Sequence, residues 1–127
     1  MRPTGIIRTL PMDHTFTGEK IIRRVLYRKL LTSFKGINEN PDERFWLLAL
    51  PTIPRIEVLH CYLIFDGRIR WRLNVAGYEG PGTKERLDGK TISARAWAIL
   101  TAPVVKPPIQ IAMKGFRGFR YTETLWE

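Results

Sequence analysis

The chain has 127 residues, of which 21 are lysine or arginine and 12 are aspartate or glutamate, so its formal net charge is +9. This length suffices for one domain with its own core, and the single cysteine, Cys61, excludes an intrachain disulfide. No apolar run is as long as a membrane span, and the first residues lack the apolar core of a signal peptide. We expect one cytoplasmic domain, residues 1–127, without a membrane segment or a cofactor. The charge favours a polyanionic partner, first nucleic acid, with an acidic protein or a membrane surface as alternatives.

The first segment of the chain, residues 1–16, lacks helical spacing. Pro3 and Pro11 flank a short apolar run, Ile6-Ile7, and proline favours extended backbone beside it. We therefore expect an N-terminal arm or an edge strand in this segment.

A basic amphipathic helix is predicted from Thr17, which can cap it, to Gly36, a natural stop. Its apolar stripe consists of Ile22, Val25, Leu26, Leu30 and Phe34. The opposite face carries the cations Lys20, Arg23, Arg24, Arg28 and Lys35. We expect the stripe to pack on the rest of the fold, with the cations facing outward. The alternative is a helix that lies on an anionic membrane.

The clearest element in the sequence is a β-hairpin. Two apolar-rich runs, residues 58–65 and 68–78, flank Asp66-Gly67, a dipeptide that tolerates the positive φ angles of a two-residue turn. An unbroken ladder from this turn places Leu63 opposite Arg70.

Alternation along the hairpin predicts two different faces. One is a core face, formed by Val58, His60, Tyr62 and Ile64 together with Ile69, Trp71, Leu73 and Val75. The other sets Leu59, Cys61, Leu63 and Phe65 against a stripe of Arg68, Arg70 and Arg72. We expect another element to cover the apolar half of this second face, while the arginines reach past its edge. They then either bind an anionic partner or only keep an exposed strand soluble.

Further strands are predicted on both sides of the hairpin. Residues 44–50 form a short buried strand that ends at Pro51, and residues 92–100 form another strand around Trp97. Turn signals fill residues 79–90 between the hairpin and this strand. The tryptophans expected in the core are Trp46, Trp71 and Trp97.

The last part of the chain interleaves glycine, aromatic and basic residues: Lys114, Gly115, Phe116, Arg117, Gly118, Phe119, Arg120 and Tyr121. Lysine and arginine bind phosphates, exposed rings stack on bases, and glycines let the backbone approach a ligand. The alternative is that the three rings belong to the core of a final strand, with the glycines at a bulge. We favour the binding interpretation because the basic residues alternate with the rings.

In the order of these elements the chain resembles the PUA-like superfamily, whose ASCH and EVE members are small β-barrels that handle nucleic acids. The resemblance rests on residues 58–78, 94–100 and 114–121. It implies an α+β fold, a small β-barrel with the basic N-terminal helix packed on it. The ASCH signature GxKxxExR aligns with residues 18–25, where Gly18 and Lys20 match. Arg23 and Val25 replace its glutamate and arginine, so no catalytic role is transferred.

Three functions are hypotheses at this stage. The first is a nucleic-acid-binding module for RNA or for single-stranded or modified DNA, whose basic groove is formed by Lys20, Arg68, Arg70, Arg72 and residues 114–121. The second is an ASCH-like RNase or nucleoside amidohydrolase that depends on Lys20. The third is a protein-binding factor, such as a mobile-element inhibitor, that occupies an acidic site on its target. The sequence shows no Ser-His-Asp arrangement, metal-ligand cluster or phosphate-binding loop, so no residue is assigned to catalysis or to a metal.

Overall fold

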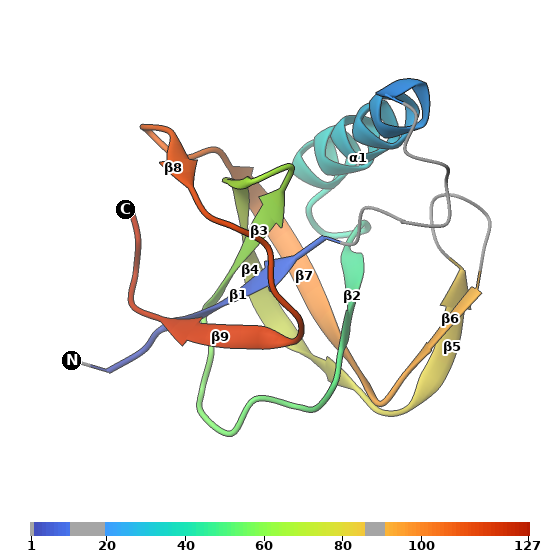
Figure 1. Ribbon diagram of the computed structural model, residues 1–127. Helices are drawn as coiled ribbons and strands as arrows, with labels where there is room; N and C mark the ends of the chain where they lie inside the picture. The colour runs from blue at the N-terminus through green and yellow to red at the C-terminus, as the bar shows by residue number, and fades with distance from the viewer. Residues whose placement is uncertain (1, 11–19, 86–90) are drawn as a thin grey trace.

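The computed structural model describes residues 2–10, 20–85 and 91–127, and the side chains of residues 20–27 also lie outside the description. In this part of the chain one helix lies beside a strongly curled sheet, and a short two-stranded ribbon projects from the sheet (Figure 1). The elements are β1 (Gly5–Thr9), α1 (Lys20–Glu39), β2 (Trp46–Leu50), β3 (His60–Phe65), β4 (Arg68–Glu79), β5 (Gly82–Glu85), β6 (Thr91–Ala94), β7 (Ala96–Val105), β8 (Ile111–Ala112) and β9 (Phe119–Thr122). The expected α+β class is confirmed, with the main sheet curled through about half of a barrel.

The main sheet has the strand order β2-β7-β4-β3-β1-β9, and β8 pairs with the start of β4. The position of β1 differs from the expectation. It is neither an arm nor an edge strand, because it pairs in parallel with β3 on one side and antiparallel with β9 on the other. Ile6 and Ile7, the two apolar residues that suggested the strand, are both buried for this reason.

The hairpin is confirmed, with Asp66 at φ 52° and Gly67 at φ 75° in its two-residue turn. Its ladder is nevertheless broken. Ile64 pairs with Ile69 but Leu63 pairs with Trp71, so Arg70 is an extra residue, a β-bulge. The predicted pairing of Leu63 with Arg70 is therefore wrong.

Beyond the bulge, each β4 residue shares a face with the β3 residue next to its predicted partner. The predicted core face and the predicted arginine stripe are therefore wrong as well. On one face, here called the inner face, Cys61 and Leu63 of β3 pack with Trp71 and Leu73 of β4. On the opposite, outer face, Arg72 lies directly across from Tyr62. β3 keeps its alternation throughout, but β4 loses it at the bulge: Ile69 packs on the outer face and Trp71, two residues later, on the inner face.

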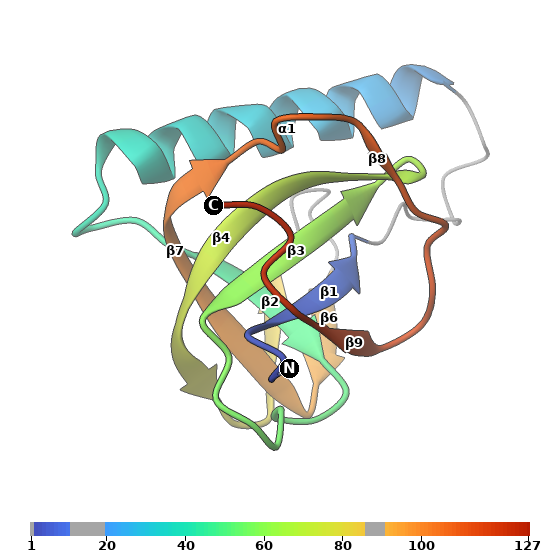
Figure 2. The same ribbon diagram turned by 90° about the vertical axis from the view of Figure 1, so that its left-hand side faces the viewer.

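Helix α1 covers the inner face in its described half. Leu30, Phe34 and Ile37 are buried in the same cluster as the inner-face residues, and the ring of Phe34 meets Trp71 edge-on at 4.9 Å between centroids. Figure 2 shows the helix running across one end of the strands. The expected packing of the helix on the sheet is confirmed for these residues, and the predicted cap at Thr17 lies outside the described residues.

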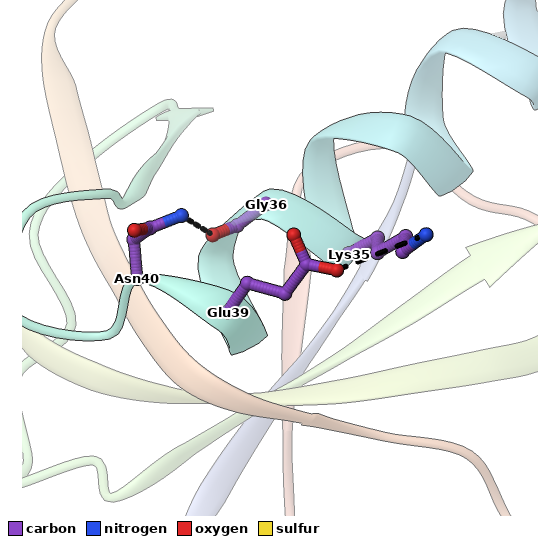
Figure 3. Close-up of polar contacts among 4 residues, drawn as sticks. All are labelled: Lys35, Gly36, Glu39 and Asn40. Atoms are coloured by element: carbon purple, nitrogen blue, oxygen red, sulfur yellow. Dashed lines mark hydrogen bonds and ion pairs between the residues drawn. The ribbon is translucent and has the colours of Figure 1, made fainter.

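The helix does not stop at Gly36, as expected, but continues to Glu39. A Cβ atom at Gly36 would lie 2.7 Å from Nη1 of Arg44, so this glycine makes room for a side chain. The helix ends at Asn40, whose backbone N and Nδ2 both donate to the carbonyl of Gly36, at 3.0 and 3.3 Å. Figure 3 shows the bond from Nδ2. Lys35 and Glu39 form an exposed ion pair one turn apart, at 3.7 Å.

The strand predicted for residues 92–100 is in fact two strands. β6 pairs with β5 in the projecting ribbon, and after Arg95 the chain enters the main sheet as β7. Trp71 and Trp97 are buried and Trp46 packs against the main cluster, which confirms the expected core role of the three tryptophans. The segment predicted for residues 44–50 is confirmed as the strand β2 at one end of the sheet.

The outer face is covered by the C-terminal part of the chain. Trp126 is buried against Tyr62, Ile64 and Ile69, and together with Ile7 these residues form a second apolar cluster on the outer face. Phe116 packs at the side of this cluster. Figure 2 shows residues 113–118 descending beside the sheet from β8 to β9, and the last residues crossing in front of β3. The C-terminal segment is thus part of the core on this side.

Candidate nucleic-acid interface

The three arginines of β4 have three different environments. Arg68 is exposed at the start of the strand, opposite Ala112 of β8. Arg70, at the bulge, donates from Nε to the carbonyl of Phe65 at 2.8 Å. Arg72 is half-buried on the outer face, where Nη1 donates to the carbonyl of Trp126 and the guanidinium carbon lies 5.4 Å from the centre of the indole. They do not form the expected stripe, and Arg68 is the one that is exposed to solvent.

The predicted binding segment separates its cations from its rings. Lys114, Arg117 and Arg120 are exposed, whereas Phe116 and Phe119 are half-buried against the two apolar clusters. Tyr121 is 42% exposed, and its hydroxyl accepts a hydrogen bond from the backbone N of Arg55 at 2.9 Å. The core interpretation therefore holds for much of the ring surface, while the cations face solvent.

One ring and one cation of the segment are stacked. The guanidinium carbon of Arg120 lies 4.0 Å from the centre of the Phe116 ring, which is contact distance for a cation–π pair. The backbone N of Phe116 donates to Oγ1 of Thr9 at 3.0 Å, and a Cβ at Gly115 would lie 2.9 Å from Cγ2 of Thr9. The end of β1 thus fixes the chain directly before the stacked pair.

The register of the sheet places Arg120 in a row with Arg72. Arg72 pairs with Tyr62, Tyr62 with Ile7, and Ile7 with Arg120 across four adjacent strands. With roughly 4.8 Å between neighbouring strands, the two arginines are roughly 14 Å apart along the outer face. An aromatic ring from the C-terminal part of the chain lies under each guanidinium.

Arg8 is a residue of this region that the sequence did not reveal. Its Nε donates to the carbonyl of Ala49 on β2 at 3.1 Å, and its Nη1 donates to the carbonyl of Gly118, just before β9, at 2.7 Å. Because β2 and β9 are the two ends of the sheet, Arg8 joins the two edges of the half-barrel. Burial lowers the pKa of this guanidinium. The one feature of the sequence that indicates the burial of Arg8 is its spacing of two residues from Ile6 and Leu10, which are buried on the inner face.

Four of the predicted site cations are exposed near β8 and β9. Arg68 lies opposite Ala112 of β8, Lys114 is the second residue after β8, Arg117 precedes β9 by two residues, and Arg120 is within β9. None of these four side chains makes an ion pair with a described residue. We call these four residues the basic edge. Lys20, the remaining predicted site residue, is the first residue of α1, and its side chain lies outside the description.

The described residues do not assemble a catalytic constellation. Cys61 is fully buried, and burial raises the pKa of its thiol to about 12, so the thiolate nucleophile is absent at neutral pH. Nδ1 of His60 is paired with Oδ1 of Asn74 at 3.2 Å. Within residues 2–10, 20–85 and 91–127 no three His, Cys, Asp or Glu side chains are grouped in a way that could hold a metal ion. In the same part of the chain no helix has the length and apolar character needed to cross a membrane.

These observations define an α+β protein whose sheet curls through half of a barrel, with a helix on its inner face and a basic edge beside β8 and β9. No family model, no curated protein and no solved structure matches the chain.

Proposed function

We propose that this protein is a nucleic-acid-binding module of PUA-like fold, which binds RNA or single-stranded or modified DNA along the basic edge. The observation that carries the proposal is the run of four exposed cations, Arg68, Lys114, Arg117 and Arg120, without an ionic partner among the described residues. Cations that neutralise phosphates supply most of the affinity of such proteins. The net charge of +9 adds a long-range attraction for the same kind of ligand.

Tyr121 supports the same proposal with aromatic surface on the edge strand β9, where it and the preceding Arg120 face opposite sides of the strand. The ring of Tyr121 is partly exposed, and its edge contact with Phe119, at 5.6 Å between centroids, holds it in place. Rings of this kind provide stacking surfaces for unpaired bases. Phe119 itself packs against the main core, so it supports Tyr121 from below.

The proposal is tested by fluorescence anisotropy of labelled single-stranded RNA, single-stranded DNA and duplex DNA, each at low and at physiological salt. We expect affinity for at least one single-stranded polymer to persist at physiological salt. Arg117→Glu should reduce that affinity and lower the slope of log K against log salt by about 0.7, the loss of one phosphate contact.

Arg95→Glu is the matched control, because Arg95 is also exposed and makes no ion pair with a described residue, but it lies between β6 and β7, away from the basic edge. Equal losses in the two variants would mean that only net charge matters, which contradicts the proposed surface. Absence of binding to all three polymers would contradict the proposed function. Co-purification with an acidic protein would then favour the inhibitor hypothesis.

A further inference from the structure

Arg120 differs from the other arginines of the sheet that lie over aromatic rings. Arg70 lies 5.9 Å from the centre of the Phe65 ring and Arg72 lies 5.4 Å from that of Trp126, and both donate to a carbonyl of the same residue whose ring they cover. Arg120 is closer to its ring, at 4.0 Å, and donates no hydrogen bond to a described residue. Among the described residues no acceptor meets the N–H groups of Arg120, so they can donate to an external acceptor.

The stacked pair is held from two directions. Arg120 stands opposite Ile7 in the ladder between β9 and β1, which sets the position of its backbone. Phe116 is half-buried in the outer-face cluster, and its backbone N is bonded to Thr9. The ring therefore restrains the guanidinium before a ligand arrives, which reduces the entropy lost on binding.

Stacking on Phe116 leaves one face of the Arg120 guanidinium toward solvent, since the side chain is exposed. We infer that an unpaired nucleobase stacks on this face, so that the ligand of the basic edge is a single-stranded nucleic acid rather than a duplex. This inference rests on the proposed function. A guanidinium plane stacks on the face of a base, and in a duplex both faces of each base are covered by its neighbours.

The neighbouring cations complete the site. Lys114 and Arg117 are exposed on the same segment, two residues before and one residue after Phe116. They would contact phosphates on either side of the stacked base, while the N–H groups at the edge of Arg120 remain in the plane of the guanidinium and can reach a phosphate as well. The site then combines charge, which accepts any nucleic acid, with stacking, which requires an unpaired base.

Substitution of arginine by lysine separates these two contributions, because lysine keeps the charge but lacks the planar face. We compare Arg120→Lys with the matched control Arg95→Lys, whose arginine is exposed, lies outside the basic edge and covers no ring among the described residues. The ligands are a labelled single strand of about ten nucleotides, the same backbone with abasic sites throughout, and the corresponding duplex. Thermal unfolding of each variant verifies that it is folded.

We expect Arg120→Lys to weaken binding of the base-bearing strand about fivefold or more, the loss of one stacked base. Its affinity for the abasic strand and its salt dependence should equal those of the wild type, and Arg95→Lys should bind both strands as the wild type does. Phe116→Leu, which keeps an apolar side chain in the cluster but removes the ring, should reproduce the loss seen in Arg120→Lys. The wild type should prefer the single strand to the duplex.

Equal affinities of Arg120→Lys and Arg95→Lys for the base-bearing strand would overturn this inference. The proposed function would still stand if the wild type bound that strand. Tighter binding of the duplex than of the single strand would also overturn the inference. If the wild type bound none of the three ligands, the proposed function and the inference would both fail.

Discussion

Leu63 of β3 lies directly opposite Trp71 of β4, one residue beyond the partner that an unbroken ladder from the Asp66-Gly67 turn would give it. The extra residue is Arg70, and it decides which side chains share a face of the sheet. Because of it, Trp71 joins Leu63 in the main core and Arg72 faces the C-terminal segment.

Two single-residue deletions should therefore have opposite outcomes. Deletion of Arg70 leaves Leu63 opposite Trp71 in a regular ladder, so the protein should still fold, with a loss of about 1–2 kcal/mol from the missing bond to Phe65 and the changed twist. Deletion of Arg72 forces either Trp71 or Leu73 out of the core, and cooperative folding should be lost. Urea unfolding followed by tryptophan fluorescence measures both. A folded protein without Arg72, or an unfolded one without Arg70, would show that the bulge does not set the register.

The bridge made by Arg8 between the two edges of the sheet should contribute to stability. In Arg8→Met, the carbonyls of Ala49 and Gly118 lose their donor, and we expect the free energy of unfolding to fall by about 1–2 kcal/mol. Arg8→Lys keeps the charge, but one ammonium cannot match the two-pronged geometry, so its stability should be intermediate. The measurement is urea unfolding at neutral pH. Stability of Arg8→Met at or above the wild-type value would mean that the burial of the guanidinium outweighs its two hydrogen bonds.

The contact between Gly115 and Thr9 gives a third prediction. Gly115→Ala brings a methyl group within 2.9 Å of Cγ2 of Thr9, which should destabilise the protein by about 1–3 kcal/mol. Thr9→Ser removes Cγ2 but keeps the hydroxyl that accepts from Phe116, so in this background the effect of Gly115→Ala should fall to less than half. A double-mutant cycle from denaturant unfolding measures the coupling. Additive effects of the two substitutions would mean that Gly115→Ala destabilises the protein through a contact other than the one with Thr9.

The buried thiol of Cys61 predicts how stability depends on alkaline pH. Burial raises the pKa of this thiol from 9.0 to about 12 in the folded protein, whereas the unfolded chain ionises near the ordinary value. The unfolded state therefore releases the proton first, and stability contributed by the neutral thiol is present below pH 9 and lost as the pH rises from 9 toward 12. The slope approaches about 1.4 kcal/mol per pH unit in that window.

Cys61→Ala serves as the control for this pH dependence, since lysines and tyrosines titrate in the same range. The difference between wild type and Cys61→Ala in the free energy of unfolding should shrink between pH 9 and pH 10.5, measured by urea titration at several pH values. A parallel pair of curves would contradict a raised pKa. In addition, a thiol reagent should modify Cys61 slowly in the folded protein at neutral pH.

Several local features were predictable from the residues alone. The Asp66-Gly67 turn, the basic helix, the strand β2 and the core position of the tryptophans all depend on short-range conformational preference or on apolar spacing. The α+β class follows from the order of these elements. The exposed cations of residues 114–121 were also visible in the sequence, because charged side chains rarely leave solvent without a partner.

Other features depend on residues that are far apart in the chain. The local sequence around Arg70 is compatible with a regular ladder or with a bulge. The bulged register brings Trp71 and Leu73 to the side of the sheet that α1 covers. The burial of Arg8 becomes possible only where residues 41 and 110 positions away supply carbonyl acceptors. Likewise, Arg72 looked like a surface cation, but Trp126 provides it with a ring and a carbonyl.

The sequence by itself determined the Asp66-Gly67 turn, the helix and the exposed cations of residues 114–121, since these follow from the preferences of neighbouring residues. The tertiary structure alone decided which face of each strand became the core, which arginines bonded to the protein's own carbonyls, and which exposed cation lies over a ring. The physical reason is that register, burial and polar satisfaction depend on the partner strand, and that partner is set by the whole chain.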